Sequence, residues 1–305
     1  MKRLLVSTVV VLLQVAQPKA PDGLTFNWPR DLTARVETEK TRERHMGGAP
    51  KSSTMRFAYR MRAAPHADGL QIQYDDFRLD GVPPSETAGL SEVLTAMVPN
   101  LIVDPRGNFL GVKDLTSLRT ALTAILRPLE KAGGDLPAGV KDLMSKLTNE
   151  EVLTSLAGQE WQMLVGAWQD APLTDERFEM ETSEVSPIWP DVKIPMRITT
   201  GMIEKGSCPR GGAKIDCALF ELRSAVDQSA MAALMKRIFE GSKDMGGVTY
   251  ERLDLVTVVR VRLETHTMVP HELTMTKTVE MAVNAPGSPR REVKQVDRRV
   301  SRFVY

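Results

Sequence analysis

The chain contains the run Arg252-Leu-Asp-Leu-Val-Thr-Val-Val-Arg-Val-Arg-Leu-Glu264, in which apolar and charged side chains alternate. Leu253, Leu255, Val259, Val261 and Leu263 share one parity, and charged residues hold most positions of the other. Successive side chains of a β-strand point to opposite faces of a sheet. The run therefore predicts a long strand with one face against a core and the other face in water.

The same pattern recurs after a predicted turn at Met268-Val-Pro-His271, with apolar residues of one parity from Leu273 to Val283. A last strand is predicted from Val293 to Tyr305, and its arginines are typical of a charged sheet edge. Antiparallel strands of about eleven residues twist and must curve to cover one core. The C-terminal third therefore predicts a curved antiparallel sheet.

Shorter alternating runs precede this region, at Leu32 to Val36, Met55 to Met61 and Leu70 to Tyr74. The apolar parity then slips, because the next apolar residues are Phe77 and Leu79. A slip of one residue turns the apolar side chains to the other face unless a bulge absorbs it. We therefore expect a β-bulge near Asp75-Asp76.

The middle of the chain, about residues 114–168, has helical periodicity. Asp114 is predicted to cap a helix whose apolar residues recur at helical spacing up to Leu129. A second apolar stripe runs from Val140 to Leu147, and Thr148-Asn-Glu-Glu151 is a capping box for a third helix that reaches Trp168. A further short helix is predicted around Met231 to Ile238. Amphipathic helices of this kind usually face the core of their own domain.

The predicted fold class is α+β: a curved antiparallel sheet, an incomplete barrel, with amphipathic helices packed on its concave face. One domain over residues 21–305 would contain all these elements. An outer-membrane barrel is the rival fold, but it needs a repeating lipid-facing band. Stepping back from Tyr305 by twos instead gives Phe303, Ser301, Arg299 and Asp297.

Two motifs carry a resemblance to a known group of proteins: Ile102-Val-Asp-Pro-Arg-Gly-Asn-Phe-Leu-Gly-Val112, which leads into a helix, and Thr267-Met-Val-Pro-His-Glu272. With the order of the elements, they resemble exported bacterial half-barrel proteins. These include carriers of the LolA type and a secreted bacterial family of unknown function. The resemblance covers most of residues 24–304 and implies a hydrophobic groove that accepts a lipid or an acyl chain.

Export is predicted by the N-terminus. Lys2 and Arg3 precede an apolar run from Leu4 to Val15, and small residues follow at Ala16 and Ala20. This is the pattern of a signal peptide, assigned to residues 1–20. The run is shorter than the about 20 apolar residues of a spanning helix. We therefore expect a periplasmic or secreted protein without a transmembrane segment in the mature chain.

The charge of the chain argues against nucleic acid as a partner. The formal net charge is +1, and loss of Lys2, Arg3 and Lys19 with the signal peptide would leave −2. Proteins that bind nucleic acid depend on a clustered basic surface. Acidic and basic residues are interspersed here until the last strand.

The two cysteines, Cys208 and Cys217, are predicted to form a disulfide. If the chain turns at Gly212-Ala213, the two residues face each other across an antiparallel hairpin, within disulfide reach. Export favours oxidation. A redox-active pair or a metal site remains the alternative, but the spacing is not Cys-x-x-Cys and the sequence has no third thiol.

Catalytic motifs are absent from the sequence: there is no Gly-x-Ser-x-Gly, His-Glu-x-x-His or glycine-rich phosphate loop. His266 and His271 are the closest histidine pair and bracket the predicted turn. Without a carboxylate partner they are expected to be surface residues rather than metal ligands. We therefore predict a protein that is not an enzyme, with no cofactor and no metal.

The predicted function is binding of an apolar ligand, a lipid or an acyl chain, in the cell envelope. Methionine is abundant, with 16 residues, and its flexible side chain suits adaptable binding surfaces as well as ordinary cores. The predicted ligand-binding residues are Met196, Met202, Met275 and Met281. The alternative is a structural or protein-interaction module of the envelope, with an envelope protein as partner and no ligand cavity. A concave, mostly apolar cavity would distinguish the two.

Overall fold

The computed structural model describes residues 23–46, 49–81, 98–120, 123, 149–185, 193–229, 231, 249–284 and 290–305. Three predicted features lie wholly or mostly outside these residues: the signal peptide, the helix at 140–147, and the helix at 231–238 beyond Met231. The helix predicted after Asp114 is described over residues 115–120, where the chain is helical.

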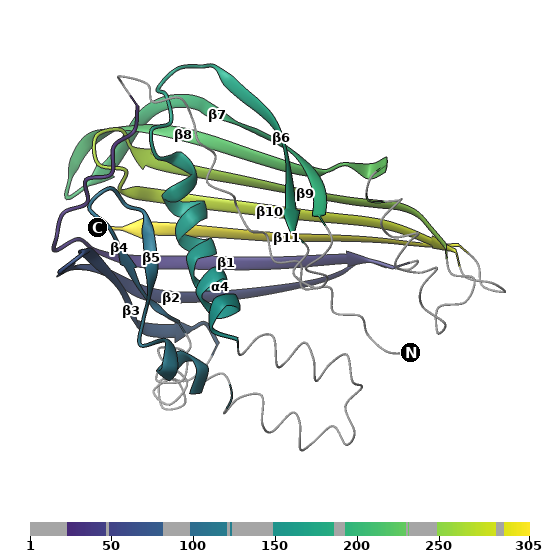
Figure 1. The fold of residues 1–305 in the computed structure, drawn as a ribbon, viewed down its shortest axis with the longest axis horizontal. Helices are drawn as coiled ribbons and strands as arrows, with labels where there is room; N and C mark the ends of the chain where they lie inside the picture. Colours follow the sequence, from purple (N-terminus) through teal and green to yellow (C-terminus); the bar gives the residue numbers. More distant parts are fainter. Residues whose placement is uncertain are drawn as a thin grey trace. The chain divides into compact units, whose positions relative to one another are not determined.

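The described strands form a large antiparallel sheet with eleven strands in the order β5-β4-β3-β2-β1-β11-β10-β9-β8-β7-β6 (Figure 1). Their bounds are β1 Thr33–His45, β2 Lys51–His66, β3 Gly69–Leu79, β4 Asn100–Val103, β5 Phe109–Lys113, β6 Arg177–Val185, β7 Lys193–Arg210, β8 Ala213–Val226, β9 Thr249–Glu264, β10 Pro270–Asn284 and β11 Arg291–Val304. The sheet is not closed, because β5 and β6 end its described strand order. The antiparallel sheet of the predicted fold class is thereby confirmed.

Besides the helical residues at 115–120, 123, 228–229 and 231, two complete helical elements are described: the helix α4, Glu150–Leu164, and the 3-10 helix η1, Gly166–Trp168. They coincide with the third predicted helix. The chain divides into two compact units. Among the described residues, unit 1 contains those within 25–35 and 58–169, and unit 2 contains those within 23–24, 36–57 and 170–305. The strands β1 and β2 contribute to both units.

In unit 1, β4 and β5 pair as an antiparallel hairpin over the motif Ile102 to Val112. Asp104 organises its turn: Oδ1 accepts hydrogen bonds from the backbone N–H groups of Arg106 and Asn108, both at 2.8 Å. Desolvation raises the pKa of Asp104, but the hydrogen bonds from Asn108 and Arg106 outweigh it and hold the pKa below its usual value. Gly107 has φ +85°, and an added Cβ would lie 2.6 Å from the ring of Phe26. The turn therefore requires glycine at this position.

Trp161 of α4 attaches the helix to this turn. Its indole Nε1 donates a 2.8 Å hydrogen bond to the carbonyl oxygen of Gly107. The rings of Phe26 and Trp28 meet the Trp161 ring edge-on, at 5.9 and 5.1 Å between centroids. Trp161 is fully buried. The motif that carried the resemblance is thus a packed junction of a hairpin and a helix.

The expected irregularity in β3 is present. Asp76 has φ +53°, which is rare for a residue other than glycine. Tyr74 and Phe77 are both buried although their positions differ in parity. The strand thus changes face at Asp76, as the apolar pattern predicted.

The strands β1 and β2 are longer than their apolar runs. β1 was expected around Leu32 to Val36 but continues to His45, and β2 begins at Lys51 rather than at Met55. The added part of β1 is almost entirely polar, so it has no apolar face by which periodicity could reveal it. β6 has no counterpart among the predicted strands.

Candidate functional site

The disulfide between Cys208 and Cys217 is present, with 5.8 Å between the Cα atoms. The predicted turn of this hairpin was displaced by one position, so the predicted pairing was wrong by two residues. Arg210 pairs with Ala213, so the chain turns at Gly211-Gly212, and Cys208 lies opposite Ile215. Both turn glycines have positive φ, +56° and +83°, as a two-residue hairpin turn requires. The disulfide therefore joins the strands diagonally.

Removing the disulfide should lower the stability of unit 2. Opening the short loop that it closes costs about 2.5–3 kcal/mol in the chain-entropy model. We expect the double variant Cys208→Ser/Cys217→Ser to lose that much free energy of unfolding in a urea titration. Wild-type protein in dithiothreitol should match the variant. An unchanged midpoint, with both thiols shown to be alkylatable, would contradict the prediction.

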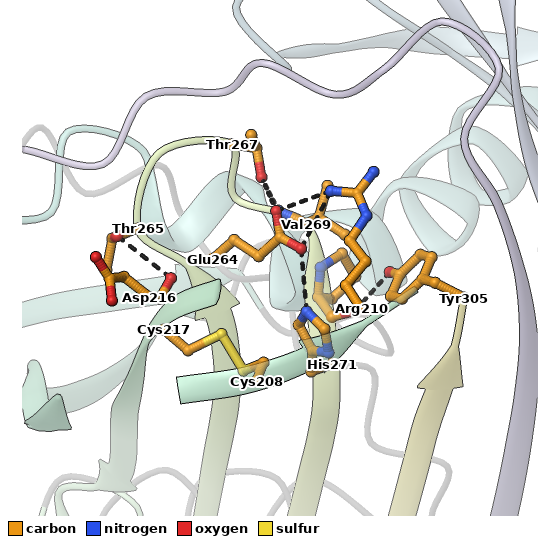
Figure 2. A network of polar contacts seen from close by, with 11 residues as sticks. Cys208, Arg210, Asp216, Cys217, Glu264, Thr265, Thr267, Val269, His271 and Tyr305 are labelled. Carbon is orange, nitrogen blue, oxygen red and sulfur yellow. Dashed lines mark hydrogen bonds and ion pairs between the residues drawn. A yellow bond between two sulfur atoms is a disulfide. The ribbon is translucent and has the colours of Figure 1, made fainter. Parts of the chain in front are cut away.

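A buried polar network lies beside the disulfide, at the turn between β9 and β10 (Figure 2). Its centre is Glu264, the last residue of β9, whose side chain is 2% exposed. Arg210 Nη1 donates to both carboxylate oxygens, at 3.1 and 3.0 Å. His271 Nε2 lies 3.1 Å from Oε1, and Thr267 Oγ1 donates to Oε2 at 2.5 Å. One carboxylate thus binds three side chains from β7, the turn and β10.

The network extends to the C-terminal Tyr305. Its hydroxyl donates a 2.5 Å hydrogen bond to the carbonyl oxygen of Pro270. The Arg210 guanidinium lies over its ring at 5.5 Å, and the His271 ring meets it edge-on at 5.4 Å (Figure 2). Burial, aided by the charge of Glu264, raises the pKa of Tyr305 well above its usual value. Tyr305 therefore stays a neutral hydrogen-bond donor over the neutral pH range.

The expectation that His271 would be an exposed residue without a carboxylate partner was wrong. His271 is 8% exposed and contacts Glu264. The register of β9 and β10 shifts between Pro270 and Glu272, a bulge that contains His271. Glu264 also departs from its predicted solvent face, because the chain enters its turn directly after it. No sequence pattern marks this network, since it depends on the bulge and on the distant Arg210.

The chemistry of the network is that of a structural junction. Cys208, Cys217 and His271 bring ligand-type atoms within 4.8 Å of one another. In the disulfide, however, neither sulfur is a thiolate, the form that binds zinc. The Glu264 carboxylate is occupied by Arg210, His271 and Thr267. These contacts join three strand ends.

The four predicted ligand-binding methionines lie on one face of the sheet. Directly opposed residues of paired strands share a face. One row across β7 to β11 is Met202, Phe220, Val261, Leu273 and Ser301. The next row is Thr200, Leu222, Val259, Met275 and Arg299. Met196 pairs with Val226, and Met281 with Leu253 and Val293, further along the same face. We call this face of β7 to β11 the methionine face.

Burial changes along the methionine face. Phe220, Val261, Leu263 and Leu273, near the turn network, are at most 1% exposed. Toward the other ends of the strands the apolar side chains are half-buried, namely Leu253, Leu255, Met275, Val279, Met281 and Val293. Met196 and Met202 are buried. The methionines therefore do not share one pocket, and Met275 and Met281 are the two in the half-buried region.

An open pocket of about 270 Å³ lies at the end of the methionine face near β6. Met196, Val226 and Pro195 supply its apolar lining, and Glu181 and Asp227 supply acidic groups. Its volume is just below the range typical of ligand sites. Met196 also packs against the buried Met231.

Comparisons with known proteins do not assign a family. No protein-family model and no curated protein matches the chain. One similar solved structure is OmpT, folded in vitro, an outer membrane protein of Vibrio cholerae, at 8% identity and a TM-score of 0.19, covering 92% of this chain and 99% of that chain. Its loop L8 deletion mutant has 8% identity and a TM-score of 0.18, covering 90% and 100%. TM-scores this low carry no argument about fold or function. Among the described residues, no helix has the length and apolar character needed to span a membrane.

Proposed function

We propose that the protein is an exported, non-enzymatic carrier that binds the acyl chain of a lipid on the half-buried part of the methionine face. The observation that supports it best is the group of half-buried apolar side chains of β9, β10 and β11, which includes Met275 and Met281. Covering such surface with an acyl chain contributes roughly 0.8 kcal/mol for each buried methylene. Unbranched methionine side chains adapt to chains of different shape.

Two further observations support the proposal. The sheet is large, antiparallel and not closed over its described strands, as a half-barrel of the LolA type would be. The disulfide suits an oxidising compartment, in agreement with the predicted signal peptide and a periplasmic or secreted location. The proposed ligand is therefore an envelope lipid.

An environment-sensitive fatty-acid probe tests this proposal. The mature protein should bind it at micromolar concentration, and unlabelled saturated acyl chains should displace it in order of length. Two additional buried methylenes should strengthen binding by roughly 15-fold. Binding that is absent, or indifferent to chain length, would instead favour the protein-interaction module.

A pair of uncharged variants locates the site. Met281→Asn places a polar amide on the methionine face, whereas Thr276→Asn changes the opposite face of the same strand. We expect Met281→Asn to weaken binding about tenfold or more and Thr276→Asn to leave it unchanged, because only the first alters the apolar surface. Thermal unfolding of both variants should show an intact transition. Equal affinities in the two variants would contradict the assignment of the face.

A further inference from the structure

Charged residues are distributed unequally between the two faces of β10, β11 and β1. From Leu273 to Met281, Val293 to Ser301 and Val36 to Arg44, the positions on the methionine face contain a single acidic residue, Asp297. The same positions contain five basic residues, which we call the basic patch: Lys40, Arg42, Arg44, Lys277 and Arg299.

Contacts between the strands show that these residues share a face. Met275 lies opposite Arg299, and Lys277 opposite Asp297, across β10 and β11. Arg42 Nε donates to Asp297 Oδ1 at 2.5 Å, and Arg44 Nε donates to Gln295 Oε1 at 2.7 Å. The hydroxyl groups of Thr38 and Ser301 are 2.9 Å apart. The face therefore continues from β11 onto β1.

On the opposite face of these strands, acidic residues outnumber basic ones. The charged positions of that face over the same three ranges are Glu37, Glu39, Glu43, Glu280, Lys294 and Arg298. Two of the acidic residues form ion pairs: Glu280 with Lys294 at 2.7 Å, and Glu39 with Arg56 of β2 at 2.7 Å. The excess of positive charge is thus confined to the face that carries the methionines.

The basic patch adjoins the half-buried apolar residues. Lys277 lies between Met275 and Val279 on the same face of β10, and Met281 follows roughly 13 Å further along the strand. Arg42 is about half exposed. An amphiphile lying along the strand would therefore bring its head group to the basic patch while its chain covers Val279 and Met281.

We propose that the ligand is a single-chain amphiphile with a phosphate monoester head group, which the basic patch binds. This rests on the proposed function. A carboxylate has one negative charge, whereas a phosphate monoester has nearly two at neutral pH and three acceptor oxygens. Guanidinium groups bind such oxygens through two N–H groups at once. Five basic residues around one acid therefore suit phosphate better than carboxylate.

Displacement of the fluorescent probe by three ligands with the same twelve-carbon chain tests the proposal: dodecyl phosphate, dodecanoate and dodecanol. We expect affinity to fall in that order, with dodecyl phosphate about tenfold tighter than dodecanol or more, and added salt to weaken the phosphate alone strongly. Equal affinities, or dodecanoate as the tightest ligand, would overturn this inference and leave the acyl site standing. Failure of all three to bind would overturn the proposed function itself.

Two double variants with the same change in net charge provide the control. Lys40→Gln/Arg44→Gln removes two charges from the basic patch and leaves the Arg42–Asp297 ion pair in place. Arg56→Gln/Lys294→Gln removes two charges from the opposite face, where exposed ion pairs contribute little to stability. The first variant should lose most of the preference for phosphate over alcohol, and the second should retain it. The same preference in both would overturn the inference.

Discussion

Glu264→Ala should lower the free energy of unfolding by about 3 kcal/mol, among the largest effects of any single substitution in unit 2. Removing one member of a buried ionic network leaves the remaining charge without compensation. Arg210 and His271 would lose their shared acceptor, and Arg210 is only 24% exposed. Urea unfolding at neutral pH measures the effect. Glu272→Ala is the control, because Glu272 is 45% exposed and its contact with Arg302 is 3.7 Å long. Equal losses in the two variants would contradict the prediction.

The Glu264 carboxylate should also make the free energy of unfolding depend on pH. Desolvation raises the pKa of Glu264, but hydrogen bonds from His271 and Thr267 and the charge of Arg210 outweigh it, so the folded pKa lies below the ordinary 4.5. A depressed folded pKa contributes stability that is present above the unfolded pKa and is lost as pH falls through the folded one. Wild-type protein should therefore lose stability below about pH 4.5 more steeply than Glu264→Gln. Parallel pH profiles for the two proteins would contradict this account.

Trp161→Ala should destabilise unit 1 by about 3–5 kcal/mol, the cost of deleting a fully buried large aromatic side chain. The variant removes the packing against Phe26 and Trp28 and the hydrogen bond to Gly107. Hydrogen exchange of residues 102–112 should accelerate strongly, because the turn loses its contact with α4. Trp161→Phe keeps most of the ring and should cost less. Leu110→Ala, at a 54% exposed position, is the control and should change little. Unchanged exchange in Trp161→Ala would contradict the prediction.

The apolar pattern predicted the strands that have one dry face. β9 and β10 alternate as expected, since Val259, Val261 and Leu273 are buried. The turn between them was displaced: residues 265–269 form it, rather than Met268 to His271. Periodicity determines the position of a turn poorly. The alternation within each flanking strand is the same wherever that strand ends.

What the sequence could not reveal depends on pairing between distant segments. The second half of β1 is charged, and its contacts with β2 and β11, such as Glu39 with Arg56 and Arg42 with Asp297, identify it as part of a sheet. Glu264 was expected on the solvent face by parity, and its burial follows from the turn and the bulge at His271. The basic patch combines both effects, so its residues look interspersed in the sequence although they share one face.

The pairing of β1 with β11 has a consequence for the time course of folding. Thr38 and Ser301, which contact each other, are 263 residues apart in the chain. A ribosome makes the N-terminus first, so β1 has to wait for the last strand before it gains this neighbour. Closing so long a loop is entropically costly and slow. β11, Arg291–Val304, lies between β1 and β10 in the folded sheet. Until it is synthesised, β1 and β10 each have an unpaired edge. A chain cut short before Arg291 would keep both edges open and would be prone to aggregate.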